Sequence, residues 1–125
     1  METQYGYEII GLKEEAKTLT SIEIPDFYNG KRVYTFHEAV FSGNTSIVEI
    51  YVGKNINNIK PNSFVGCSAL KKLIMHEEID PDKFTVYEGL FNGTSNCKVY
   101  VPEAKVQNYI HAYWWSHYGA YIEGY

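Results

Sequence analysis

Leu19-Thr-Ser-Ile22-Glu-Ile24 is the first of four related segments that recur in order along this chain. The later segments are Ile47-Val-Glu-Ile50-Tyr-Val52, Leu70-Lys-Lys-Leu73-Ile-Met75 and the shortened Val99-Tyr-Val101. A Phe-x-Gly triplet precedes each of them, at Phe41-Ser-Gly43, Phe64-Val-Gly66 and Phe91-Asn-Gly93. Repetition in fixed order at intervals of roughly 20 to 50 residues is typical of stacked repeats. The sequence therefore predicts a solenoid, a class of fold that usually acts by presenting a surface.

The spacing inside each segment predicts a short strand. The full segments begin at residues 19, 47 and 70, and apolar residues occupy their first, fourth and sixth places. Because side chains alternate across a strand, the fourth and sixth point to one face and the fifth to the other. Parallel stacking of these strands would satisfy their backbone groups and bury a continuous aliphatic ladder.

The connecting segments predict turns. Phe64 is expected to anchor a short helical or 3₁₀ turn inside the coil, and Gly43 and Gly66 to meet a need for positive φ or for close approach of the backbone. Asn29-Gly30 predicts a small hairpin in the first connection. Residues 77–84 are polar, contain a proline and are expected to bulge outward. Upstream, residues 5–9 predict a strand that covers the N-terminal end, with one face formed by Tyr5, Tyr7 and Ile9.

The C-terminal segment has a different period. Pro102 suits the first turn of a helix, and apolar residues follow at three- and four-residue spacing as far as Tyr113. We expect a helix over residues 103–117 that covers the last coil, followed by a short tail from Gly119. Such a cap would protect the aliphatic residues and the unpaired strand edge of the last coil.

Length and charge restrict the class of protein. The chain has 125 residues and a net charge of −4, with acidic and basic residues interspersed. We expect one domain over residues 1–125, divided into an N-terminal cap (1–18), three repeats (19–95) and a last strand with a helical cap (96–125). A nucleic-acid surface would be basic and clustered. The sequence shows no signal peptide and no bilayer-spanning run, which leaves two alternatives: a cytoplasmic protein or a piece of an exported one.

No catalytic or metal-binding constellation is recognisable. Cys67 and Cys97 lack the paired spacing of a zinc site, and we predict that both are reduced, buried thiols. None of the four histidines forms the two-histidine helical pair of a zinc enzyme. Acidic pairs at residues 14–15, 77–78 and 80/82 fall on predicted loops, where solvated charge is the simplest interpretation. We therefore expect no enzyme activity, no metal and no cofactor.

The outward side chains of the predicted strands form two rows. The fifth places are Glu23, Tyr51, Ile74 and Tyr100, and the third places are Ser21, Glu49, Lys72 and Lys98. Since neighbouring strands lie about 4.8 Å apart, Tyr51, Ile74 and Tyr100 would be contiguous. Glu49 and Lys72 would be cross-strand neighbours, a contact that contributes roughly 0.2–1 kcal/mol. The rows either stabilise the sheet alone or also form a protein-binding patch.

Trp114 and Trp115 form a second candidate site in the predicted cap. A helix cannot bury two adjacent residues on one face, so one of the pair is expected to be exposed. An exposed tryptophan could stack on a sugar or lie against a neighbouring domain. Packing of the end cap is the alternative role for both.

The chain resembles the BspA-like leucine-rich repeats over nearly its whole length. The resemblance is carried by Leu-x-x-Ile-x-Ile-Pro at 19–25 and by Ala39-Val-Phe41-Ser-Gly43-Asn44, Asn62-Ser-Phe64-Val-Gly66-Cys67-Ser-Ala-Leu70 and Tyr100-Val-Pro-Glu103. Gly53 and His76 depart from the usual Ile-Pro pattern. The family implies an α/β solenoid, with short parallel strands in a curved right-handed coil between an N-terminal strand cap and a C-terminal helical cap.

The same resemblance implies a role in binding. The family occurs mostly in cell-surface and secreted proteins of bacteria and some protozoa, and it is associated with adhesion and protein binding. We therefore expect a non-catalytic module whose partner is a protein, such as a host or extracellular-matrix component. A carbohydrate-binding module and a structural spacer in a larger surface protein are the two alternatives.

Overall fold

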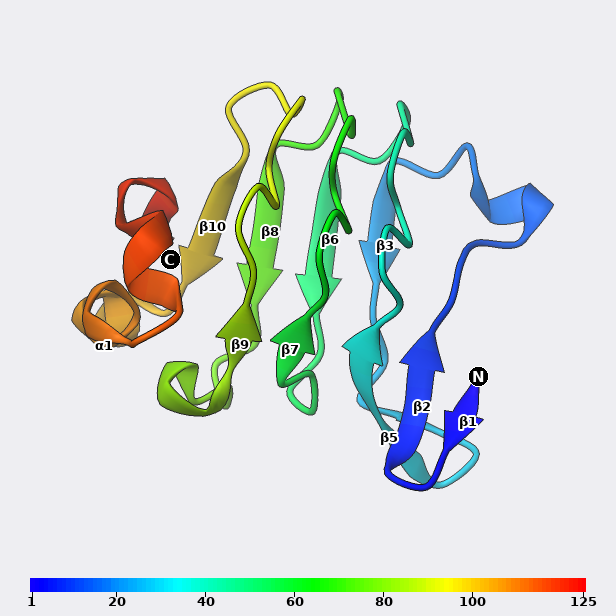
Figure 1. Ribbon diagram of the computed structural model, residues 1–125, viewed down its shortest axis with the longest axis horizontal. Helices are drawn as coiled ribbons and strands as arrows, with labels where there is room; N and C mark the ends of the chain where they lie inside the picture. Colours follow the sequence, from blue (N-terminus) through cyan, green and yellow to red (C-terminus); the bar gives the residue numbers. More distant parts are fainter.

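The computed structural model describes residues 1–125 as two facing sheets of short strands, with helical segments at one end (Figure 1). The five-stranded sheet has the order β11-β10-β8-β6-β3, and all its neighbouring strands are parallel. Its strands are β3 (Ser21–Glu23), β6 (Glu49–Val52), β8 (Lys72–Met75), β10 (Lys98–Val101) and β11 (Ile122–Gly124). The first four are the strands that the repeat predicts, so this prediction is confirmed.

The inward side chains of the five-stranded sheet stack in register. Ile22 pairs with Ile50, Ile50 with Leu73, and Leu73 with Val99. Ile22 is 9% exposed and the other three are fully buried. Burial of one such aliphatic side chain contributes roughly 1.5–3 kcal/mol. Each copy therefore buries its aliphatic pair against the copies beside it, as the alternation within the segments predicts.

A second sheet of six strands faces the first, and the repeat pattern does not predict it. Its path is β1-β2-β5-β7-β9, with β4 paired antiparallel to β5. Its strands are β1 (Glu2–Thr3), β2 (Gly6–Ile9), β4 (Phe27–Tyr28), β5 (Lys31–Phe36), β7 (Asn58–Ile59) and β9 (Thr85–Val86). From β5 to β10, successive strands alternate between the two sheets (Figure 1). The two-residue strands β7 and β9 are too short to leave a periodic signal in the sequence.

The N-terminal strand extends the six-stranded sheet. β2 pairs in parallel with β5, and Asn29-Gly30 forms the predicted tight turn between β4 and β5, with φ of 51° and 76°. Tyr7 and Ile9 share a half-buried face, as predicted. Tyr5 does not share it: it lies in the turn before β2 and is 60% exposed. Gly6, with a φ of 135°, redirects the chain at this point.

The three phenylalanines of the Phe-x-Gly triplets form a stack between the sheets. The Phe64 ring lies 6.1 Å from the Phe41 ring and 6.0 Å from the Phe91 ring, with interplanar angles of 4° and 9°. Phe64 is fully buried, and its two neighbours are at most 6% exposed. The predicted inward position of Phe64 is therefore confirmed and recurs in the other two copies, but residues 61–66 form turns in place of the expected helical or 3₁₀ segment.

The glycines of the same triplets hold adjacent coils close together. Gly43, Gly66 and Gly93 have φ of 79°, 76° and 82°, a region that L side chains rarely adopt. The Gly43 N–H donates to the Val65 carbonyl at 2.9 Å, and the Gly66 N–H donates to the Asn92 carbonyl at 2.8 Å. A Cβ on Gly93 would lie 3.0 Å from the Gly66 backbone. A side chain there would force the two turns apart.

The predicted single helix over residues 103–117 is wrong. The segment forms a 3₁₀ turn (η3, Glu103–Lys105), a short helix α1 (Val106–His111) and a second 3₁₀ segment (η4, Trp115–Tyr121). Between the last two, Ala112 is extended, with φ of −68° and ψ of 141°. This break lets Tyr109 and Trp115 both reach the core, where their rings lie 5.4 Å apart and are fully buried.

The segment from Gly119 onward also differs from the predicted short tail. η4 continues to Tyr121, and β11 then pairs in parallel with β10, so that Ile122 lies beside Val99. The Tyr125 N–H donates to the Val101 carbonyl at 2.8 Å. The edge of the last repeat strand is thus covered by another strand, while α1 and η4 close the end of the core (Figure 1).

The remaining predictions for this region concern the third coil and the two thiols. The expected excursion is a single 3₁₀ turn (η2, Pro81–Lys83), in which the Asp82 N–H donates to the Asp80 carboxylate at 3.0 Å. Cys67 and Cys97 are buried and unpaired, as predicted. Burial raises the pKa of the Cys97 thiol to about 12. Both cysteines therefore act as small core residues.

Replacing Phe64 by Ala should lower the free energy of unfolding by about 3–5 kcal/mol, because the cavity removes contacts on both faces of the ring. Urea denaturation followed by circular dichroism measures this loss. Phe27→Ala is the control, since Phe27 is 56% exposed and its removal should change the stability by less than about 0.5 kcal/mol. Equal losses for the two variants would contradict a central role for the stack.

Candidate functional site

A groove of about 720 Å³ lies on the outward face of the five-stranded sheet. We name it the sheet groove. It is lined by outward residues of β3, β6, β8 and β10 and by residues that follow these strands, among them Glu23, Tyr51, Lys72, Ile74, Tyr100 and His76. The groove therefore lies where strands from all four copies meet, which only the stacked fold brings together.

The apolar floor of the sheet groove is the predicted row of fifth-place residues. Tyr51 is the Cα partner of Ile74, and Ile74 is the Cα partner of Tyr100. Tyr51 is 42% exposed, and the other two are half-buried. Glu23 is in register with Tyr51, as predicted, and the row continues beyond the prediction because Glu123 of β11 is in register with Tyr100.

The predicted neighbours Glu49 and Lys72 are Cα partners, but they do not form the expected ion pair. A Glu49 carboxylate oxygen accepts a hydrogen bond from the Ser21 hydroxyl at 3.2 Å. The Lys72 ammonium lies over the Tyr100 ring, 5.4 Å from its centre. A cation over an aromatic face is stabilised by the ring quadrupole, which explains why Lys72 leans away from Glu49. Of the two, only Lys72 lines the sheet groove.

One end of the sheet groove is built from residues at which the repeat departs from its own pattern. Gly53 and His76 stand where the first copy has Pro25, directly after the strand. A Cβ on Gly53 would lie 2.7 Å from the Ile24 carbonyl oxygen and 3.0 Å from the Asp26 carboxylate. These residues were not among the predicted site residues. The sequence feature that could have indicated Gly53 and His76 is the local break in the repeat pattern, since such breaks are expected at functional positions.

A second depression, of about 420 Å³, lies at the cap end of the six-stranded sheet. We name it the cap pocket. Trp114 is 38% exposed at its wall, with the Tyr87 ring 6.4 Å away. The polar side chains of Glu88 and His117 also line it. One exposed tryptophan is what the adjacent pair predicts.

Trp115 does not belong to any binding surface. It is fully buried, and its ring lies 5.4 Å from the Phe84 ring. The prediction that Trp115 contributes to partner binding is therefore wrong. The cause is the break at Ala112, which turns Trp115 inward and leaves Trp114 at the surface.

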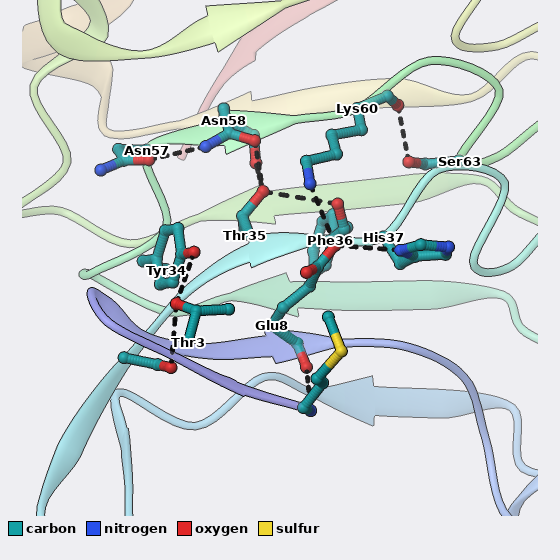
Figure 2. Close-up of polar contacts among 12 residues, drawn as sticks. Thr3, Glu8, Tyr34, Thr35, Phe36, His37, Asn57, Asn58, Lys60 and Ser63 are labelled. Atoms are coloured by element: carbon teal, nitrogen blue, oxygen red, sulfur yellow. Dashed lines mark hydrogen bonds and ion pairs between the residues drawn. The ribbon is translucent and has the colours of Figure 1, made fainter.

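The sequence pattern does not predict the buried carboxylate on β2. The Glu8 side chain is 5% exposed, and one of its oxygens contacts Lys60 Nζ at 3.0 Å and His37 Nδ1 at 3.1 Å. Figure 2 shows this cluster beside further polar contacts, including the bond from the Thr35 hydroxyl to the Asn58 side chain. Burial opposes ionisation, but the hydrogen bonds from Lys60 and His37 outweigh it and hold the pKa of Glu8 below its usual value.

The Glu8 cluster has a structural explanation. It links β2 to residues that directly follow β5 and β7, so it fastens the N-terminal strand to the rest of the six-stranded sheet. The Lys60 carbonyl also accepts a hydrogen bond from the Ser63 hydroxyl at 2.7 Å. The charged groups compensate one another, which a buried carboxylate requires.

Comparison with known protein families matches residues 14–116 to the family described as BspA type leucine rich repeat region (6 copies). The chain belongs to the BspA-type leucine-rich repeat family. Leucine-rich repeats generally mediate protein–protein interactions and are generally non-catalytic, which is consistent with a binding module. No curated protein matches the chain.

Two further observations bear on the chemistry of this family member. No group of three or more His, Cys, Asp or Glu side chains is placed to hold a metal ion. None of the helical segments has the length and apolar character needed to cross a membrane.

Glu8→Gln should lower the free energy of unfolding at pH 7 by about 1–3 kcal/mol, because it removes the charged acceptor of two hydrogen bonds. The folded-state pKa of Glu8 lies below its value in the unfolded chain, so the stabilisation is complete above the unfolded-state value and disappears as the pH falls through the folded-state pKa. Urea denaturation at several pH values between 7 and 3 should therefore show the gap between parent and variant closing in acid.

The control for this measurement is Glu38→Gln, which changes an exposed acid with no ion pair. Its stability should follow that of the parent at every pH. A gap between parent and Glu8→Gln that stays constant from pH 7 to pH 3 would refute the assigned role of the Glu8 charge.

Proposed function

We propose that residues 1–125 form one right-handed solenoid module that binds a protein partner through the sheet groove. The observation that supports this is the in-register row of Tyr51, Ile74 and Tyr100 along the groove floor. Aromatic side chains in a concave, partly apolar surface are the residues that most often dominate interface energy. A sheet that needed these residues only for its own stability would not require a groove around them.

The proposed setting is a cell-surface or secreted protein, in which the module serves adhesion to a host or extracellular-matrix protein. Family membership supports this, since BspA-type repeats are typically found in surface proteins. The open groove supports a recognition role over that of a spacer. The proposed activity is binding alone, with no covalent step.

The first test is capture of the purified protein on arrays of extracellular proteins, in parallel with the variant Tyr51→Ser/Ile74→Ser/Tyr100→Ser. Loss of one buried hot-spot side chain costs about 2 kcal/mol or more, so the triple variant should bind any true partner at least about 30-fold more weakly. Circular dichroism must show that the variant remains folded.

The matched control is Tyr5→Ser/Ile10→Ser/Tyr28→Ser, which makes the same chemical changes at exposed positions outside the groove. This control should bind as the parent does. Equal capture of the parent and the groove variant would exclude the sheet groove as the binding surface. Absence of capture for all three proteins would favour the spacer.

The cap pocket supports a second candidate function, recognition of a glycan. Trp114 offers an exposed indole face, and Glu88 and His117 offer hydrogen-bonding groups beside it. A sugar ring commonly requires both an aromatic platform and polar partners. Because Trp115 is fully buried, Trp114 is the tryptophan whose fluorescence would report on a ligand in this pocket.

Titration with an oligosaccharide from a positive array spot should change the tryptophan emission of the parent and of the groove triple variant. Trp114→Ala should abolish the change, since the remaining Trp115 has no access to the ligand. A signal that survives in Trp114→Ala, or that disappears in the groove triple variant, would place the glycan elsewhere.

A further inference from the structure

The charges around the sheet groove are unbalanced. Glu23, Asp26 and Glu77 line it, opposed by the single ammonium of Lys72. None of these three carboxylates takes part in an ion pair. Asp26 is partly satisfied, because it accepts a hydrogen bond from the Lys54 N–H at 2.9 Å. The other two carboxylates have no such partner and leave negative charge available to a ligand.

The negative charge is also placed at defined points along the apolar row. The register runs Glu23, Tyr51, Ile74, Tyr100 and Glu123, one residue from each strand of the five-stranded sheet. Glu23 and Glu123 are both exposed; Glu23 lines the groove, and Glu123 lies just outside it. With neighbouring strands about 4.8 Å apart, the backbones of these two residues lie about 19 Å from each other, on either side of three apolar residues.

Lys72 restricts where a cationic ligand can place its charges. Its ammonium already lies over the Tyr100 ring, one strand from Ile74, and would repel a second cation placed over Tyr100 or Ile74. The middle of the groove therefore favours an uncharged, apolar group over Ile74. Positive groups are favoured only toward the two ends, where the carboxylates stand.

We propose that the sheet groove binds an extended cationic segment of a partner protein, an inference that rests on the protein-binding role proposed above. The segment crosses the strands with apolar or aromatic side chains two and four positions after its first basic residue, because these places share one face of an extended chain and lie on either side of Ile74. Two Lys or Arg side chains flank them and pair with Glu23 and Glu123. An extended chain advances about 3.3 Å per residue, so the two basic residues stand about six positions apart.

The test uses a displayed library of random twelve-residue peptides, selected on the purified protein and counter-selected on the folded variant Tyr51→Ser/Ile74→Ser/Tyr100→Ser. The expected result is enrichment of peptides with two basic residues six positions apart and an apolar residue two or four positions after the first. Enrichment of neutral or acidic peptides, or of basic ones without this spacing, would overturn the cationic-segment proposal. In that case the protein-binding role would stand, because the peptides still depend on the groove.

The second measurement compares charge variants with one synthetic peptide from the selection. Glu23→Gln/Glu123→Gln should weaken binding about five- to tenfold at low salt and reduce the salt dependence seen with the parent. Glu15→Gln/Glu38→Gln removes the same charge from exposed positions outside the groove and should bind as the parent does. Equal affinities for the two double variants would overturn the pairing, and failure to enrich any groove-dependent peptide would overturn the proposal as a whole.

Discussion

Everything in this structure depends on the parallel register between successive copies. The register sets Ile50 against Leu73 in the core and, through the same backbone bonds, sets Tyr51 against Ile74 outside it. The turns support it from the other side, where Phe64 stacks between its counterparts in the neighbouring copies. A one-residue slip would exchange the two faces of a strand, so the core and the groove floor are specified by one constraint.

The sequence predicts well those features that recur and poorly those that occur once. Four repeat strands, their inward pairs and the phenylalanine anchors follow from a pattern seen several times, in which chance matches are averaged out. The six-stranded sheet escapes prediction because β7 and β9 contain two residues each, and two residues have no period. The prediction of the cap fails for a related reason. The helical spacing of apolar residues continues through Ala112, but this single residue is extended, and the break buries Trp115.

The candidate site likewise combines residues that the repeat predicts with residues that it does not predict. Tyr51, Ile74, Tyr100 and Lys72 come from the repeat and lie together in the sheet groove. Gly124 and Tyr125, which also line the groove, come from a unique segment, and only the fold shows that this segment lies beside the repeat strands. Glu8 is a further case: an acid inside an apolar strand gives no sign of its partners, which lie 29 and 52 residues further along the chain.

The seventh place of each copy has a consequence for how this surface can change. Pro25, Gly53, His76 and Pro102 occupy it, immediately after the strands that hold the core. None of the four belongs to the hydrophobic core cluster, although Gly53 is itself buried, and the first three line the groove. Substitutions at Pro25 and His76 can therefore alter the shape and polarity of the groove while the aliphatic ladder stays intact, whereas Gly53 has no room for a side chain. The fold thus leaves part of the groove wall independent of the residues that maintain stability.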